Sequence, residues 1–505
     1  MERAEADRTR VAPEIVGSHD EAAAATEDAE ADPARERERE LERLQPWWEQ
    51  VTARGVVAAT LIGFVFTVIV MKIALTTGLV PTLNISAALL AFLTLRGWTR
   101  ALERLGFSPR PFTRQENTVV QTCAVACYTI SFGGGFGSSL LALNKKTYEL
   151  AGVSTPGNSP GKYKEPGVGW MTGFLFAISF VGLLNLLPLR KRDEVFNKDY
   201  IPNWLAYAGY ALLSIVAIIA IPVMFRQVKW YYVVVAYVLA PVLGFSNAYG
   251  TGLTDMNMSY NYGKIALFIF AAWGGRDNGV IAGLVGCGIV KQLVQVSADL
   301  MHDFKTGHLT LTSPRSMLVG QAIGTAMGCI IAPLTFLLFY KAFDIGNPDG
   351  YWKAPYALIF RNMAILGVEG FSALPKHCLE LSAGFFAFSV LINLMRDFLP
   401  LKYRDYVPLP MAMAVPFLVG ANFAIDMCVG SLIVFAWHKI NSKEAALLLP
   451  AVASGFICGD GIWTFPSSLL SLAKNLEYDY HPCRVLGGTS IWRNFGFLSY
   501  RVPGR

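Results

Sequence analysis

The chain has 505 residues, of which 53% are hydrophobic and only 16% are charged, and its mean hydropathy is +0.40. This composition is too apolar for an ordinary soluble domain, so it argues against a water-soluble enzyme. Lys and Arg outnumber Asp and Glu by 43 to 37, and the basic residues lie in short clusters between long apolar runs. That is the loop pattern of a polytopic membrane protein, and it argues against a nucleic acid partner.

The first residues differ from the rest of the chain. Residues 1–44 hold 14 acidic and 7 basic side chains, a net charge of −7, which leaves +13 for the remainder. An Ala- and Glu-rich segment of this kind cannot bury a core, so we expect residues 1–50 to form a disordered acidic tail in the cytosol. The 8 cysteines include no CxxC pair, so neither a disulfide framework nor a thiolate metal cage is predicted.

Residues 51–474 are predicted to form an all-α polytopic bundle embedded in the lipid bilayer. A helix needs about 20 apolar residues to cross the hydrocarbon layer, and the chain offers about a dozen such segments, some short or broken. The candidate spans are 55–77, 79–95, 118–143, 168–187, 204–224, 230–246, 264–273, 279–296, 317–340, 357–371, 379–394, 411–437 and 446–472.

The basic clusters predict the orientation of these spans. One cluster follows the second span and another follows the fourth, and short loops rich in Lys and Arg stay in the cytosol. The N-terminal tail belongs on the same side, because residues 55–95 are long enough to cross the bilayer and return. The two clusters are Arg96, Arg100, Arg104, Arg110 and Arg114, and then Arg190, Lys191 and Arg192.

Four spans are interrupted by glycine or proline, at Gly133–Gly137, Gly250–Gly252, Pro408–Pro416 and Gly455–Gly461. Broken helices at membrane depth occur where the backbone lines a cavity, so these breaks favour a transport pathway. The alternative is that membrane helices simply tolerate more glycine and proline than soluble ones.

An internal echo accompanies two of these breaks. Residues 136–145 and 465–474 agree at seven of ten positions, and each segment follows a Gly-rich break. Paired broken segments predict a repeat-built transporter with its site near the repeat interface. Coincidence stays open, because Ser-Ser-Leu-Leu is an easy string for membrane helices.

Ionisable groups are costly inside apolar spans, so each one is a candidate for substrate or proton handling. Residues 291–315 form the richest cluster, and on a helix Asp299, His302 and Asp303 share one face. Two carboxylates and an imidazole can bind a cation or relay a proton, but nothing fixes a full set of metal ligands. A solvated loop is the alternative. The cluster also contains Lys305, His308 and Arg315.

Two further sets of polar residues suggest a pathway. A polar, aromatic patch follows Gly250 and is expected to line a cavity; it comprises Asp255, Asn257, Tyr260, Asn261 and Tyr262. Asp426 and Asp460 are lone carboxylates within apolar runs, which suits proton coupling if burial favours their protonated form. Structural hydrogen bonding is the other interpretation of these two residues.

The sequence contains none of the catalytic motifs that would support an enzyme. The chain has no His-Glu-x-x-His, no Gly-x-Ser-x-Gly and no phosphate loop, so no catalytic residue and no cofactor is predicted. A secondary carrier remains as the predicted class of protein.

Long stretches resemble the yellow-stripe-like branch of the plant oligopeptide transporter family: residues 112–127, 164–173, 247–261, 297–314, 354–358, 369–375 and 455–463. The resemblance covers residues 47–474. It implies a plasma-membrane symporter that carries iron or related divalent metals, bound to nicotianamine or a phytosiderophore, together with protons. Because the metal arrives chelated, no direct metal ligand is expected, and the family's matching stretch implies a pathway role for Asp299, His302, Asp303, Lys305, His308 and Arg315.

Two departures from that family raise alternatives. After Leu184–Lys191 family members continue through further membrane spans, whereas here Arg192–Asp199 joins directly to Tyr200, so an internal block near residues 191–200 is absent. Residues 475–505 form an atypical polar tail. The alternatives are an oligopeptide carrier, or a transport-incompetent partner of a full-length transporter; a homo-oligomer also stays open.

Overall fold

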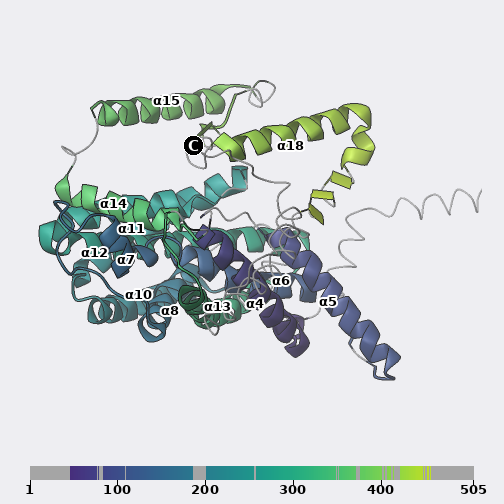
Figure 1. The fold of residues 1–505 in the computed structure, drawn as a ribbon. Helices are drawn as coiled ribbons and strands as arrows, with labels where there is room; N and C mark the ends of the chain where they lie inside the picture. Colours follow the sequence, from purple (N-terminus) through teal and green to yellow (C-terminus); the bar gives the residue numbers. More distant parts are fainter. Residues whose placement is uncertain are drawn as a thin grey trace, which may run out of the picture.

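The structure, a computed structural model, describes residues 46–456 except for 77, 79–82, 109, 186–198, 200, 255–256, 349, 351, 371–375, 401–402, 404–406, 411–412, 415–420, 447, 450–451 and 454. Within these residues every long regular element is a helix (Figure 1). Six of them are long and apolar enough to cross a membrane: α4 (Ala53–Thr76), α10 (Asn203–Met224), α11 (Trp230–Thr254), α12 (Ser259–Leu309), α13 (Pro314–Ala342) and α15 (Cys378–Phe398). The prediction of an all-α polytopic membrane protein is therefore confirmed.

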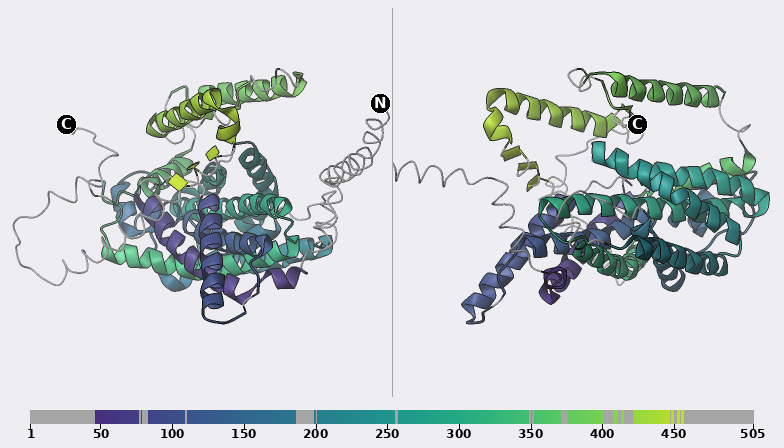
Figure 2. Two further views of the ribbon diagram at one scale, coloured as in Figure 1. Left: turned by 90° about the vertical axis from the view of Figure 1, so that its right-hand side faces the viewer. Right: turned by 180° about the vertical axis from the view of Figure 1, so that it is seen from behind.

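The first two long helices, α4 and α5 (Asn84–Arg104), contact one another. Because α5 is not among the six helices that are long and apolar enough to cross a membrane, the predicted crossing and return stays a prediction. The short helix α3 (Trp47–Gln50) precedes α4, and α5 projects from the bundle (Figures 1 and 2). Small residues let α4 lie closely on α6 (Arg114–Gly133). A Cβ on Gly63 would meet the Cys127 side chain at 2.9 Å, so this contact requires glycine.

The predicted break at Gly133–Gly137 is confirmed. Helix α6 ends at Gly133, and the chain then makes tight turns before η1 (Leu141–Leu143) and α7 (Lys145–Leu150). Gly135 has a φ of +86°, a conformation that side chains other than glycine rarely adopt. A Cβ on Gly137 would lie 2.4 Å from the carbonyl oxygen of Ala74. Residues 118–143 therefore do not form one continuous span.

Helix α12 is a tight helical hairpin. Its helical backbone is interrupted at Gly275, where φ is 64° and ψ is −166°, a combination that is essentially restricted to glycine. The two arms return along one another so closely that a Cβ on Gly283 would meet the Leu267 carbonyl oxygen at 2.8 Å. The predicted spans 264–273 and 279–296 are the two arms of this hairpin. Small residues therefore allow its close packing.

The second arm of α12 lies at the centre of the protein. Its residues from Gly279 to Ala298 are all buried, and α12 packs against α6, α8 (Val168–Leu184), α11 and α14 (Pro355–Glu369). Helix α13 covers α6, α4 and α8. Polar side chains between Gly279 and Ala298 therefore face other helices and not lipid.

Helices α15 and α18 (Ala421–Ile440) lie to one side of this bundle (Figures 1 and 2). Only Ile392 of α15 is buried, and the described side chains of α18 are exposed or partly exposed. Both helices are apolar. The bundle thus covers almost none of their surface.

Two further predicted breaks and the internal echo have different outcomes. The Gly250–Gly252 break is wrong, because α11 continues through it to Thr254 and the helical backbone resumes at Ser259. Packing in a membrane readily overrides the low helix propensity of glycine. Pro408–Pro416 is described only in part, Gly455–Gly461 falls largely outside the described residues, and the second copy of the echo at residues 465–474 lies wholly outside them.

Candidate functional site: a buried polar column on α12

Four polar residues spaced by four follow the second arm of α12 and define what we call the polar column: Lys291, Gln295, Asp299 and Asp303. Side chains four residues apart lie on neighbouring turns, and each step advances about 40° around the helix. The column therefore winds along the helix, from the middle of the second arm towards its C-terminal end.

Lys291 lies at the N-terminal end of the column and is fully buried. Its ammonium donates to the carbonyl oxygen of Phe132 at 2.7 Å and to the hydroxyl of Ser138 at 3.1 Å. The same nitrogen lies 3.8 Å from the ring centroid of Tyr260. Phe132 and Ser138 flank the glycine break, so Lys291 satisfies carbonyl and hydroxyl groups that the interrupted helix leaves open.

Gln295 and Asp299 form the middle of the column and join it to the hairpin's beginning. The Gln295 amide donates to both oxygens of Asp299, at 3.1 and 2.9 Å, and its oxygen accepts from the Ser259 hydroxyl at 2.6 Å. Asn257 donates to Asp299 at 3.1 Å, and Asn247 donates to Asn257 at 2.8 Å. Amide groups thus connect α11, the turn before α12 and the second arm.

A second polar chain meets the column from the side of α5 and α6. The Tyr128 hydroxyl donates to the Asn84 oxygen at 2.9 Å, and the Asn84 amide lies 3.0 Å from Nδ1 of His302. An amide nitrogen can only donate, so Nδ1 of His302 accepts and the ring carries its proton on Nε2. Protonation of Nδ1 would break this hydrogen bond.

Asp303 lies at the C-terminal end of the column and has a different environment. It is fully buried, and neither carboxyl oxygen has a hydrogen-bond partner in the described part of the chain. The neighbouring side chains of Leu300, Phe304 and Met317 form an apolar cluster. Asp299 and Asp303, one helical turn apart, therefore differ strongly in how their charge is supported.

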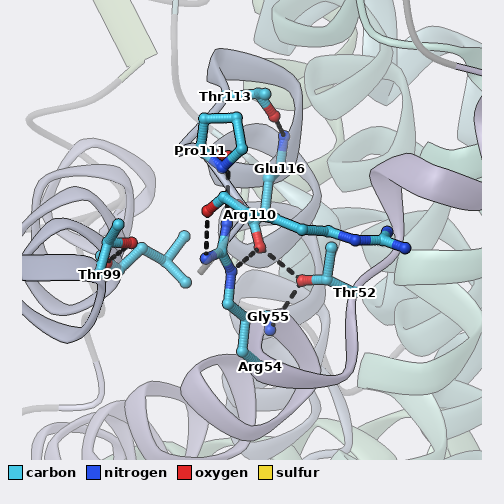
Figure 3. A network of polar contacts seen from close by, with 9 residues as sticks. Thr52, Arg54, Gly55, Thr99, Arg110, Pro111, Thr113 and Glu116 are labelled. Atoms are coloured by element: carbon cyan, nitrogen blue, oxygen red, sulfur yellow. Dashed lines mark hydrogen bonds and ion pairs between the residues drawn. The ribbon is translucent and has the colours of Figure 1, made fainter. Parts of the chain in front are cut away.

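The end of the bundle near the C-terminus of α12 is closed by an ion pair (Figure 3). Arg54 binds both oxygens of the buried Glu116, with Nε at 2.7 Å and Nη2 at 2.6 Å, and donates to the Arg110 carbonyl oxygen at 2.8 Å. Thr52 also donates to Glu116, at 2.5 Å. A cavity of about 280 Å³ adjoins this pair and is lined by Glu49, Thr52, Arg54, Arg110, Pro111, Thr113 and Glu116.

The opposite end of the bundle is closed by residues 151–167, which contact the hairpin tip. Lys162 donates to Asn278 at 3.3 Å. The fully buried Arg361 of α14 donates to Asn158 at 2.9 Å and to the Lys162 carbonyl oxygen at 3.0 Å. Lys164 lies over the rings of Trp170 and Phe225, and burial lowers its pKa from the ordinary value.

The structure brings together only part of the predicted site. Asn257, Asp299, His302 and Asp303 lie in or beside the column, whereas Asn261 is paired with Lys264. Lys305 is exposed, and His308 and Arg315 are partly buried near the junction of α12 and α13. Asp426 is exposed on α18, so its predicted role stays a prediction. Asp255 and Asp460 lie outside the described residues.

The alternative interpretation of residues 291–315 as a solvated loop is wrong for residues 291–309, which lie in a helix whose first part is buried. Sequence reasoning assigned no site role to Lys291, Gln295, Asn84 or Asn247. The four-residue spacing of the column was a usable signal for the first two. In the described part of the chain no three His, Cys, Asp or Glu side chains form a group that can hold a metal ion.

Comparison with known proteins agrees over most of the chain. Residues 50–192 and 190–471 match the OPT oligopeptide transporter protein family. Metal-nicotianamine transporter YSL2 from Oryza sativa subsp. japonica is 63% identical over 634 aligned positions, covering 86% of this chain and 94% of that protein. Iron-phytosiderophore transporter YSL15 from the same plant is 56% identical, and the alignment covers 94% of this chain and 98% of that protein.

A third relative, iron-phytosiderophore transporter yellow stripe 1 from Zea mays, is 53% identical, and the alignment covers 89% of this chain and 95% of that protein. The 634 aligned positions in the first comparison exceed the 505 residues of this chain, so part of that relative lies opposite no residue here. The two family matches meet near residue 191. The chain is a multi-pass membrane protein of the OPT oligopeptide transporter family.

Proposed function

We propose that the chain carries iron or related divalent metals, chelated by nicotianamine or a phytosiderophore, across the plasma membrane together with protons. Relatives that are 53% to 63% identical bear the names metal-nicotianamine or iron-phytosiderophore transporter. The observation in this chain that carries the proposal is the polar column, a row of hydrogen-bonding groups buried among membrane-spanning helices. Such groups are costly there and mark a substrate route.

The chemistry of the column supports a chelate as cargo. A metal wrapped in the amines and carboxylates of its chelator presents carboxylate oxygens to the protein, and these accept from ammonium and amide groups. Lys291, Gln295 and Asn257 offer such donors at successive levels of one helical hairpin. Their present partners are protein oxygens, and an incoming carboxylate replaces those oxygens without leaving donors unpaired.

Uptake in cells that lack their own iron uptake tests the proposal. The full chain, reconstituted in their plasma membrane, is expected to accumulate radioactive iron supplied as the nicotianamine or phytosiderophore complex, and faster at acidic external pH. Free di- and tripeptides serve as competitors. Equal accumulation of peptides and chelates contradicts a chelate-specific carrier and favours the oligopeptide alternative.

A second candidate function is supported by a separate observation. Apart from Ile392, the α15 side chains lie at the surface of the bundle, and the described side chains of α18 do so too, although both helices are apolar. The aligned relative contains positions with no counterpart in this chain. We therefore also consider a transport-incompetent partner of a full-length transporter, whose spans cover these helices. If the chain shows no uptake, and uptake returns when the spans missing near residues 191–200 are restored, the result favours this function.

A further inference from the structure

Asp303 differs from the other acidic residue of the column in a way that the pathway does not explain. Asp299 receives hydrogen bonds from Gln295 and Asn257. Asp303 is fully buried, yet both of its oxygens lack a hydrogen-bond partner among the described residues. Buried polar groups are nearly always hydrogen-bonded, so an orphaned carboxyl group is a feature that requires a function.

No described side chain or backbone group donates a hydrogen bond to the charged form of this carboxyl group. Among the described residues, the titratable groups that face it are Tyr128 from α6 and, on its own helix, Asp299 and His302. Neither Tyr128 nor Asp299 supplies positive charge, and His302 supplies it only with both ring nitrogens protonated, which the Asn84 amide nitrogen beside Nδ1 opposes. Leu300 and Phe304, close to it in sequence on the same helix, belong to a buried apolar cluster. An ionised carboxylate without donors in such a place is far less stable than the neutral acid.

We propose that Asp303 holds the transported proton in this conformation, as a neutral carboxylic acid at the C-terminal end of the polar column. This inference rests on the proposed function of proton-driven chelate transport. On protonation one O–H bond forms on a carboxyl oxygen, and on release that bond breaks and the proton passes to water. No oxidation or reduction accompanies either step.

The surrounding helices explain how release can depend on conformation. In the present arrangement no described donor reaches Asp303, so the anion has nothing to stabilise it. Movement of α12 relative to α5 and α6 breaks the bond between Asn84 and His302 and exposes the acid to water or to a protonated imidazole. Either partner stabilises the carboxylate, so the proton leaves only after the helices move. Proton release therefore requires a change of conformation.

The assignment differs from the carboxylates that the sequence suggested for proton coupling. Asp426 is exposed on α18 and outside the bundle's interior, whereas Asp303 lies on the central hairpin arm, one turn from Asp299. A carrier couples proton and substrate most directly when both bind to the same element. Asp303 satisfies this condition.

Infrared spectroscopy of the purified full-length chain tests the protonation directly. A protonated carboxyl group absorbs as a C=O stretch, at higher frequency than an ionised carboxylate. At neutral pH the wild-type chain is expected to show this band, Asp303→Asn to lose it, and Asp299→Asn to keep it. A band unchanged by Asp303→Asn, or no band in the wild-type chain, overturns the proposal. Absence of the band in the wild-type chain overturns the proposal even if a variant misfolds.

Uptake measured against external pH separates this inference from the proposed function. In the wild-type chain the rate is expected to rise several-fold as the outside becomes acidic; in Asp303→Asn the profile becomes flat, and in Asp299→Asn its slope remains. A flat wild-type profile contradicts proton-driven transport itself, and the infrared band still decides whether Asp303 is neutral. A pH-dependent wild-type profile that Asp303→Asn leaves unchanged overturns only the assignment of Asp303.

Discussion

The ammonium of Lys291 donates to the carbonyl oxygen of Phe132 at 2.7 Å, and so a buried lysine on the central hairpin caps the broken end of α6. The last carbonyl groups of a helix have no partner within the helix, and a cation suits the negative end of its dipole. This contact joins the two structural features of a transport pathway in this chain, the helix break and the polar column.

Replacement of Lys291 by methionine is expected to destabilise the protein and weaken chelate binding. The change removes the Lys291 donor from the Ser138 hydroxyl and one of two described donors from the Phe132 carbonyl oxygen, which also accepts from the Gly135 N–H. We expect a cost of about 1–3 kcal/mol in the free energy of unfolding. Thermal unfolding in detergent and equilibrium binding of radioactive iron chelate measure the two effects. Lys341→Met, at an exposed lysine of α13, is the control. Chelate binding equal to wild type in Lys291→Met excludes the lysine from the site.

The Arg54–Glu116 pair is expected to hold α4, α6 and the loop before α6 together. Arg54→Met leaves a Glu116 side chain that is only 3% exposed without its cation, and loss of one partner of a buried pair costs about 3 kcal/mol. We expect a clear fall in the melting temperature, and a smaller fall when Glu116→Gln accompanies Arg54→Met. If the double variant is as unstable as the single one, the unpaired charge is not the cause.

The α12 hairpin is expected to depend on glycine at its closest approach. A Cβ on Gly279 would lie 2.3 Å from the Ala271 carbonyl oxygen, so Gly279→Ala forces the arms apart and costs about 1–3 kcal/mol. A Cβ on Gly169 of α8 meets nothing within 4 Å, so Gly169→Ala is the matched control. Melting temperatures in the same detergent provide the comparison, and equal values for both variants contradict the described packing.

The contact between Lys146 and Asp344 is expected to give a small pH-dependent contribution to stability. Lys146, and then Asn347, hold the pKa of Asp344 below its ordinary value. A carboxyl group with a depressed folded pKa contributes stability above its unfolded pKa and loses it as pH falls through the folded value. Lys146→Gln should therefore lower the melting temperature slightly at neutral pH and not at strongly acidic pH. The opposite pH dependence contradicts the pairing.

The sequence predicted some of the local features that glycine determines. The glycines at Gly133–Gly137 predicted the end of α6. The sequence reasoning did not single out Gly275, where the predicted spans 264–273 and 279–296 are joined as a hairpin. The same reasoning was wrong at Gly250–Gly252, where α11 continues. Glycine permits a break, but the neighbouring helices decide whether one occurs.

The candidate site was predictable only along α12 itself. Asp299 and Asp303 followed from their spacing on one helix. Asn84 of α5 contacts His302, and Asn247 of α11 holds the Asn257 that donates to Asp299. A pairing between distant segments has no local signal in a single sequence. The contrast between a hydrogen-bonded Asp299 and an orphaned Asp303 likewise arises from packing and not from spacing.

The central claim is that the polar column binds the chelate, and equilibrium binding of radioactive iron chelate to the purified chain tests it most directly. Gln295→Leu removes the middle amide of the column, whereas Gln321→Leu makes the same change at an equally buried position on α13 that has no described hydrogen bond to the column. We expect at least a tenfold loss of affinity in Gln295→Leu, equivalent to about 1.4 kcal/mol, and wild-type affinity in Gln321→Leu. Wild-type affinity in Gln295→Leu, with the chain folded, contradicts the account.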